Sequence, residues 1–287
     1  MLWPGYIGLS VGLLVLIVAS ISDIKTREVP DWLNFGLIAF AIGGSVILSI
    51  YHGYIHIFWN AVIGLAAGLV IGLVMFYSGQ WGGGDSKLIF GLSALIGLSL
   101  SDFSRTIPLL VMFFINILLV GAIYGLFFTI IKAAAHYKAF KEAADIKSKT
   151  KKIIITRILF LILGVLSFIF LLATRSNESI ILFGFVVVLF IFFYLWLFVS
   201  LVEKVCMIQQ MKVKDLTEGE WIINPVKKAN KIILHPTKIG ITMKQIALLK
   251  RHKIQNVTIK VGIPFVPSFL IAYVLTFIFG NWLMFLL

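Results

Sequence analysis

The chain is poor in cysteine and in acidic residues. Cys206 is the single cysteine among 287 residues, so no disulfide can form within the chain and paired cysteines cannot build a zinc site. Only 12 residues are acidic, against 25 lysines and arginines, and the formal net charge is +13. Charged residues make up 13% of the chain and hydrophobic residues 60%. Soluble domains are less apolar than this, so we expect a membrane protein.

Long runs without charge give the number of membrane crossings. A helix needs about 20 apolar residues to cross the hydrocarbon layer. The strands of a membrane β-barrel alternate apolar and polar residues, whereas these runs are apolar on all sides. We therefore predict an all-α polytopic membrane protein with about eight transmembrane helices, or six core helices plus two. The expected spans are 3–22, 32–51, 55–77, 87–101, 107–131, 153–174, 179–202 and 263–287, of which the fourth is the shortest.

Basic residues gather on one side of these spans. Segment 132–152 contains seven lysines and two acids, and segment 203–262 contains twelve basic residues and four acids. The positive-inside rule then places both segments in the cytoplasm and the N-terminus outside. The first span has its basic residues, Lys25 and Arg27, after it, which predicts a retained helix rather than a cleaved signal peptide. Trp81 is expected at the membrane interface.

The charge of +13 has an ordinary explanation in this topology. Lysines beside membrane spans fix the orientation of the chain and contact anionic lipid headgroups. No nucleic-acid motif accompanies them. Membrane lipids are therefore expected partners, and nucleic acid is not.

The spans and loops suggest five regions. Residues 1–131 form a membrane core, 132–152 a basic connector, 153–202 an additional helix pair, 203–262 a small α+β cytoplasmic domain and 263–287 the final helix. Within the connector, 136–147 has the pattern of a short amphipathic helix. In the small domain we expect strands near 220–223, 231–234 and 256–261 and a helix that Thr242 caps and that runs to about 252.

Four of the few acids lie on the two cytoplasmic loops of the first four spans: Asp23, Glu28, Asp31 and Asp85. Ionisable groups at membrane depth are costly, and they are candidates for function for that reason. Asp23 ends span 1 and Asp85 precedes span 4. Spans 2 and 3 form an out-and-back hairpin between them, so the two aspartates can meet at one side of the membrane.

Two nearby carboxylates support acid–base hydrolysis without a metal. Like charges a few ångströms apart cannot both ionise easily, so the pair shares one proton. The ionised member activates water and the protonated member hydrogen-bonds the scissile carbonyl. The preceding Gly82, Gly83 and Gly84 permit positive φ and leave the backbone open to a peptide substrate.

Other interpretations of the same residues stay open at this point. Asp85 is also placed to cap a helix, and Asp23 to pair with a neighbouring basic residue. An ion- or proton-coupled transporter would use acids too, although nearer the middle of its spans. A membrane anchor with a basic domain would need neither aspartate.

Combined, the two acidic motifs resemble one family. Gly82-Gly83-Gly84-Asp85 followed by Ser86-Lys87-Leu88 resembles the GxGD-x-K-L signature of prepilin peptidases, which are membrane aspartyl proteases. Asp23 with Arg27, Val29 and Pro30 resembles the first motif of that family, with Asp31 at a position where asparagine is usual. Segments 214–220 and 262–267 resemble the archaeal preflagellin and prepilin peptidases.

The resemblance implies an endopeptidase that removes class III signal peptides from preflagellin and prepilin precursors at the cytoplasmic membrane face. It implies Asp23 and Asp85 as the catalytic pair and the three glycines as the loop around them. We expect Glu28 and Asp31 to receive the basic leader, and Lys87 either to tune the pair or to reach lipid headgroups. No metal or cofactor is expected. The sequence leaves open which aspartate carries the shared proton.

Overall fold

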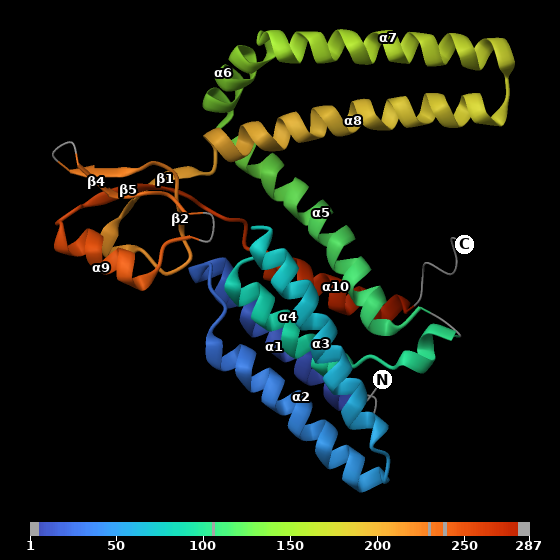
Figure 1. Ribbon diagram of the computed structural model, residues 1–287, viewed down its shortest axis with the longest axis vertical. Helices are drawn as coiled ribbons and strands as arrows, with labels where there is room; N and C mark the ends of the chain where they lie inside the picture. The colour runs from blue at the N-terminus through green and yellow to red at the C-terminus, as the bar shows by residue number, and fades with distance from the viewer. Residues whose placement is uncertain (1–5, 105–106, 229–230, 238–239, 281–287) are drawn as a thin grey trace. The chain divides into compact units, whose positions relative to one another are not determined.

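The computed structural model describes residues 6–104, 107–228, 231–237 and 240–280 (Figure 1). The chain forms two compact units. The first contains residues 1–125, 211–257 and 262–287, and the second contains residues 126–210 and 258–261.

Six helices within the described ranges are long and apolar enough to cross a membrane, which confirms a polytopic helical fold. Many of their apolar side chains point outward, and Ile50 and Leu161 are 77% and 67% exposed. Such a surface is stable where lipid covers it. The six helices are α1 (Tyr6–Thr26), α2 (Asp31–His52), α3 (His56–Tyr77), α5 (Leu109–Ala135), α7 (Lys151–Thr174) and α8 (Asn177–Val205).

Helices α4 (Gly83–Ile96) and α10 (Val266–Phe279) are shorter, with 14 described residues each. A helix of that length extends about 21 Å, less than the roughly 30 Å of the hydrocarbon core. The predicted fourth span, 87–101, therefore starts and ends too late. The helix begins at the glycine run and stops at Gly97, whose φ is +72°. Of the predicted last span, 263–287, residues 281–287 lie outside the described residues.

Helix α4 is the centre of the first unit. It packs against α2 and α3, and its large side chains, such as Leu88 and Leu92, are fully buried. Small residues allow the close approach. The Cβ of an alanine at Gly64 of α3 would lie 2.3 Å from the carbonyl oxygen of Ser93, and one at Gly68 would lie 2.5 Å from Ser93 Oγ. Close packing of this kind holds helices together in lipid.

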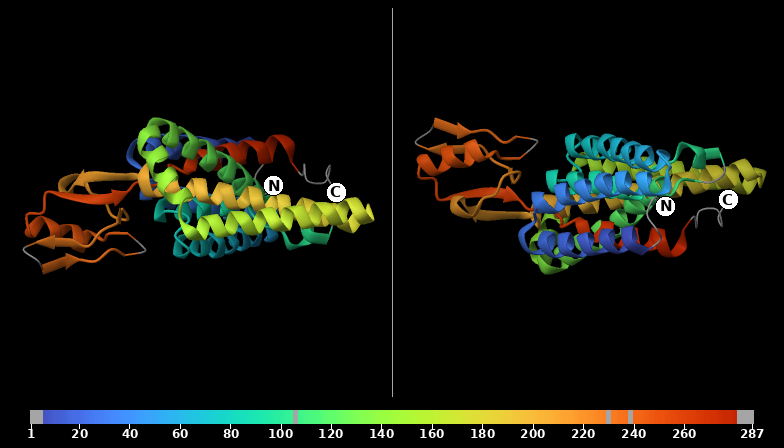
Figure 2. Two further views of the ribbon diagram at one scale, coloured as in Figure 1. Left: turned by 90° about the horizontal axis from the view of Figure 1, so that it is seen from above. Right: turned by 90° about the horizontal axis from the view of Figure 1, so that it is seen from below.

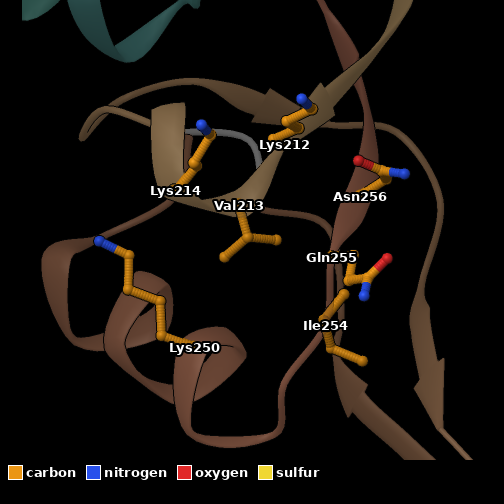
Figure 3. Close-up of a pocket in the computed structure, with 7 residues that line it drawn as sticks. All are labelled: Lys212, Val213, Lys214, Lys250, Ile254, Gln255 and Asn256. Carbon is orange, nitrogen blue, oxygen red and sulfur yellow. The ribbon is translucent and has the colours of Figure 1, made fainter.

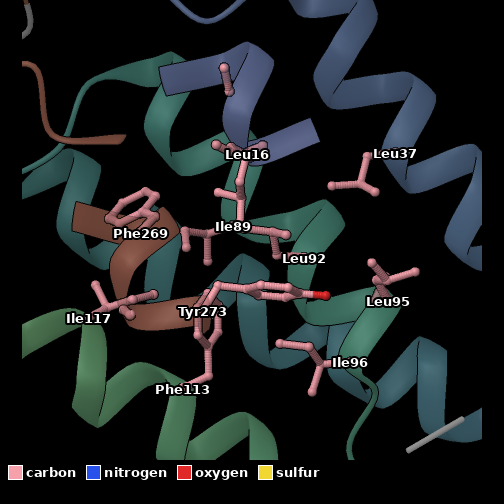
Figure 4. Close-up of a cluster of buried hydrophobic side chains, with 14 of the residues drawn as sticks. Leu16, Leu37, Ile89, Leu92, Leu95, Ile96, Phe113, Ile117, Phe269 and Tyr273 are labelled. Carbon is pink, nitrogen blue, oxygen red and sulfur yellow. The ribbon is translucent and has the colours of Figure 1, made fainter. Parts of the chain in front are cut away.

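Helix α10 joins the same core, although it is far away in the sequence (Figure 4). The Tyr273 ring meets Phe113 of α5 edge to face, with 5.8 Å between ring centroids. The Tyr273 hydroxyl donates to the carbonyl oxygens of Gly8 and Leu9 on α1, at 3.4 Å each. Gly12 leaves room for this ring, since a Cβ there would lie 2.3 Å from the hydroxyl oxygen. The core thus fixes α10 beside α1.

The second unit contains the antiparallel helices α7 and α8, which lie side by side in every view (Figure 2). A short helix, α6 (Tyr137–Ser148), packs against α8 through Phe140 and Phe198, with 5.5 Å between the ring centroids. The amphipathic helix predicted for 136–147 is therefore confirmed.

The predicted strands and capped helix of residues 203–262 are also confirmed. Strands β1 (Ile208–Lys212), β5 (Asn256–Lys260) and β2 (Trp221–Ile222) form a sheet in that order, and β3 (Val226–Lys228) pairs antiparallel with β4 (Lys231–Leu234). Thr242 caps α9 (Met243–Arg251) by accepting from the amide of Gln245 at 3.4 Å, and Gln245 accepts from the Thr242 amide at 2.9 Å. Strands β1 and β3 were not predicted.

The small domain carries a basic hollow of about 470 Å³ (Figure 3). Val213 is 2% exposed, and its amide donates to the carbonyl of Gln255 at 2.9 Å, which ties the two sides of the hollow together. Exposed lysines at its rim contribute to the charge excess of this segment. The lining residues are Lys212, Val213, Lys214, Lys250, Ile254, Gln255 and Asn256.

The packing of α3 on α4 gives a first testable prediction. Replacing glycine by alanine inside a helix normally stabilises a protein by roughly 0.5–1 kcal/mol. Gly64→Ala should instead destabilise it by about 1–3 kcal/mol, because the new methyl group overlaps backbone atoms of α4. The matched control is Gly43→Ala on α2, which has no atom within 4 Å of the new Cβ. Thermal unfolding of both purified variants in one detergent checks the prediction, and equal stability would contradict it.

Candidate active site

Asp23 lies in the last turn of α1 and is only 4% exposed. Its Oδ2 accepts a hydrogen bond of 2.9 Å from the backbone amide of Val266, at the start of α10. The helix ends soon afterwards, because Arg27 adopts a left-handed conformation with φ of +61°. The Arg27 guanidinium donates to the carbonyl oxygen of Gly262. Asp23 is therefore held between α1 and the segment that begins α10.

Asp85 lies in the first turn of α4 and is partly buried. Its Oδ2 accepts a hydrogen bond of 3.0 Å from the backbone amide of Gly82, the N-cap residue. This is one half of a capping box, in which a side chain three positions into the helix satisfies the N-cap amide. The capping role that the sequence left open is thus present.

The glycine run does not use the conformational freedom that the sequence suggested. Gly82 has a φ of −71°, and Gly83 and Gly84 continue into the helix, while the positive φ occurs earlier, at Gly79. What these glycines supply is space. The Cβ of any other residue at Gly84 would lie 3.2 Å from both the Cβ and the amide nitrogen of Val29. Gly82 and Gly83 are exposed, so their backbone is accessible.

Three further contacts join the segment that follows Asp23 to the segment around Asp85. Val29, which is 6% exposed, packs directly on Gly84. The Asn34 side-chain amide donates to the Gly84 carbonyl at 3.4 Å. The Lys87 ammonium lies 2.6 Å from Asp31 Oδ1. Because both motifs are tied together on either side of the aspartates, the two carboxyl groups are held in one region.

The electrostatics of Asp85 agree with this placement. Burial and, to a smaller extent, the charge of the nearby Asp23 carboxylate raise the pKa of Asp85 to about 7, against the opposing effect of the hydrogen bond from Gly82. A carboxyl group with such a pKa is about half protonated at neutral pH. The arrangement therefore brings a carboxyl group that can keep its proton near a second carboxyl group.

Lys87 has a protein partner that the sequence did not suggest for it. It pairs with Asp31, and its ammonium lies 5.5 Å from the centroid of the Phe35 ring. The side chains of Lys87 and Asp31 are 37% and 62% exposed, so the pair is a surface ion pair that adds little stability by itself. The pair offsets the charge of Asp31 and engages the Lys87 ammonium.

Glu28 has a neighbour that the sequence did not reveal. Burial raises the pKa of Glu220, and the negative charge of Glu28 raises it further, while the Thr217 amide, which donates to Glu220 Oε2 at 3.1 Å, opposes the rise. Neither glutamate forms an ion pair with the basic residues of the described ranges. The two side chains thus make a negative patch on the same unit as the aspartates.

Residues of α10 are the main part of the site that the sequence analysis missed. Trp81, which was expected at the membrane interface, is 4% exposed and packs on Phe269, with 5.0 Å between ring centroids. It also lies near Phe265, with 6.4 Å between ring centroids. The segment 262–267 was noted only for its resemblance, and nothing in its spacing pointed to Asp23.

Within the described residues, no group of three or more His, Cys, Asp or Glu side chains lies close enough to hold a metal ion.

The raised pKa of Asp85 makes a prediction about stability. A carboxyl pKa that is higher in the folded than in the unfolded chain costs stability as pH rises, and the loss is complete above the folded pKa of about 7. Asp85→Asn stays neutral, so it should raise the apparent Tm by several degrees at pH 8 and by nothing at pH 4. Thermal unfolding at both pH values checks this, with the exposed Asp145→Asn as control. A gain at pH 4 as large as that at pH 8 would contradict it.

Comparisons with known proteins agree with the two motifs. Residues 10–126 match the Type IV leader peptidase family. A preflagellin peptidase from Methanococcus maripaludis is 36% identical over 86 residues, which is 30% of this chain and 37% of that protein. The preflagellin peptidases of Methanococcus voltae and Methanocaldococcus jannaschii are 36% and 38% identical over 90 and 87 residues, covering 31% and 30% of this chain and 38% and 36% of their own lengths.

The chain thus spans a little over a third of the length of the curated relatives that it matches. The family match contains α4 and most of α1, and with them both aspartates, but it does not reach α10. The resemblance predicted from the motifs around Asp23 and Asp85 is confirmed: residues 10–126 are similar to the Type IV leader peptidases.

Proposed function

We propose that this protein is a membrane aspartyl endopeptidase that removes the leader peptides of preflagellin- or prepilin-like precursors at the cytoplasmic membrane face. The observation that carries the proposal is the packing of the two acidic motifs on each other through Val29 and Gly84, with Asp23 and Asp85 in electrostatic contact beside them. The similarity of residues 10–126 to leader peptidases supports the same reaction.

The proposed reaction uses water as the nucleophile. The ionised carboxylate takes a proton from water while the oxygen attacks the scissile carbonyl carbon, and the protonated carboxyl group gives its proton to the carbonyl oxygen. The tetrahedral intermediate then collapses. Its C–N bond breaks as a proton passes to the leaving amine, and the pair returns to one proton in total. The products are one new carboxylic acid and one new amine, and no metal or covalent intermediate takes part.

The position of the pair suits a substrate that stays in the membrane. Asp23 is at the end of one membrane helix and Asp85 at the start of the short α4. In the proposed topology both ends lie at the cytoplasmic edge, where the short leader meets its apolar helix. An ion-coupled transporter would place its acids nearer the middle of its spans, so the positions of Asp23 and Asp85 favour the peptidase.

The exposed backbone at Gly82 and Gly83 fits an extended substrate. A peptide held for cleavage needs backbone hydrogen-bond partners, which a surface without side chains can offer at close range. Glu28 and Glu220 add negative charge on the same unit, and this charge suits the basic residues of a leader. Asp31 adds less, because Lys87 already neutralises it.

The dyad itself provides the first test of this function. Asp23→Asn and Asp85→Asn should each lower cleavage of a precursor by about 10²–10⁴-fold, since each removes one acid–base group. The assay follows the shortened product of a synthetic preflagellin with the full chain in lipid vesicles. Asp145→Asn, an exposed acid of α6, is the matched control and should cleave at the wild-type rate. Wild-type cleavage by either dyad variant would refute the proposed function.

Leader recognition provides a second test. Glu28→Gln together with Glu220→Gln should raise KM for a basic leader several-fold at low salt, with kcat unchanged. The difference should shrink at high salt, because exposed charges are screened beyond about 3 Å at 1 M. Asp31→Asn should have a smaller effect, and Asp215→Asn, an exposed acid of the small domain, serves as the control. An equal increase of KM for a leader without lysine or arginine would contradict recognition by charge.

A further inference from the structure

The two carboxyl groups of the proposed dyad have unequal surroundings. Asp23 accepts a backbone hydrogen bond from Val266 at 2.9 Å, with a weaker contribution from the Phe265 amide, and Asp85 accepts one from Gly82 at 3.0 Å. Helix starts favour negative charge on both sides to a similar extent. Burial is the largest effect on both aspartates and opposes a charge on each of them, so a preference for charge on Asp23 has to come from the other charged groups that face the pair.

Among the described residues, a cation acts on Asp23 and none acts on Asp85. The charge of the Arg27 guanidinium acts on the Asp23 carboxylate from the end of the same helix. The other titratable groups that interact with Asp23 are Asp85 from α4 and Tyr124 from α5. Lys87 is the cation nearest to Asp85 in the sequence, and its ammonium is engaged by Asp31 at 2.6 Å. Within the part of the chain that the structure describes, Asp85 thus has a carboxylate beside it and no cation that balances its own charge.

Several contacts fix the position of the start of α10 beside Asp23. The same Arg27 guanidinium donates to the carbonyl of Gly262, four residues before Val266. On the other side, Trp81 and Phe265 lie in aromatic contact, and Phe265 also fills the space beside Gly121. The Val266 amide is therefore fixed by contacts on two sides, so its hydrogen bond does not depend on the aspartate alone.

We propose that the first turn of α10 is a positioning element of the active site: the Val266 amide and Arg27 keep Asp23 as the ionised member of the dyad, and Asp85 carries the shared proton. This inference rests on the proposed function. It makes Asp23 the base that activates water and Asp85 the acid that polarises the scissile carbonyl. It also extends the site to a segment outside the matched residues 10–126.

Removing single backbone N–H groups tests the assignment. Replacing the residue at 266 by the corresponding α-hydroxy acid turns its amide into an ester, which deletes the donor to Asp23 and keeps the side chain. The pH profile of kcat/KM for precursor cleavage is measured with the full chain in lipid vesicles. A dyad that works with one proton gives a bell-shaped profile, whose acid limb reports the first ionisation and whose basic limb reports the second.

With the ester at 266, we expect the acid limb to move to higher pH by about one to two units, because a hydrogen bond to a charged group is lost. The basic limb should stay in place. The ester at Gly82 is the mirror experiment, and it should move the basic limb instead. The ester at Ser268 is the matched control, because its amide donates only to the carbonyl of Phe265, and it should move neither limb.

A second variant covers the case in which the ester protein does not fold. Arg27→Gln removes the cation beside Asp23 and should likewise move the acid limb to higher pH. If the ester at 266 or Arg27→Gln moves the basic limb, or leaves both limbs in place, the assignment is wrong. That result is separate from failure of the proposed function, which would appear as normal cleavage by Asp23→Asn or Asp85→Asn.

Discussion

Two carboxyl groups held close together at the end of membrane helices cannot both be charged without a large cost, and the site of this protein is arranged around that constraint. Asp23 is almost completely buried, and Asp85 is partly buried beside it. Backbone amides hydrogen-bond both aspartates, at the start of α10 for Asp23 and in the glycine run for Asp85. Backbone donors, rather than two cations, hold the carboxyl groups in place, so neither side chain is locked into a salt bridge.

Small residues make this arrangement possible. Gly84 lets α4 approach Val29, Gly64 and Gly68 let α3 approach α4, and Gly12 makes room for Tyr273. Each glycine removes a side chain at a place where two backbones or a ring must come close. In lipid, where apolar surfaces gain little by leaving their solvent, such close packing is the main source of helix association. Close packing therefore stabilises the core around the aspartates more than the hydrophobic effect does.

Charged side chains contribute less to holding the aspartates in place, but they decide where negative charge remains on the protein. Lys87 is engaged by Asp31, and Arg27 is engaged by the Gly262 carbonyl. Both basic residues belong to the motif segments, and both act on neighbouring segments. Glu28 and Glu220 remain without a basic partner in the described ranges, which leaves negative charge on a protein with a net charge of +13. The negative charge of this patch would attract a basic substrate, whereas the net positive charge of the protein would repel it.

The sequence by itself determined the membrane class, the long apolar helices, the strands and capped helix of the small domain, and the positions of Asp23 and Asp85 near the ends of two helices. These features follow from local composition, periodicity and motif spacing, which the chain carries without reference to distant residues. Tertiary structure alone decided that Val266 bonds Asp23, that Trp81 is buried against Phe269, that Lys87 pairs with Asp31 and that the glycine run supplies space instead of positive φ. The physical reason is the same in each case: these contacts join residues from different segments of the chain, 56 residues apart for Lys87 and Asp31 and 243 apart for Val266 and Asp23, and only packing selects such partners.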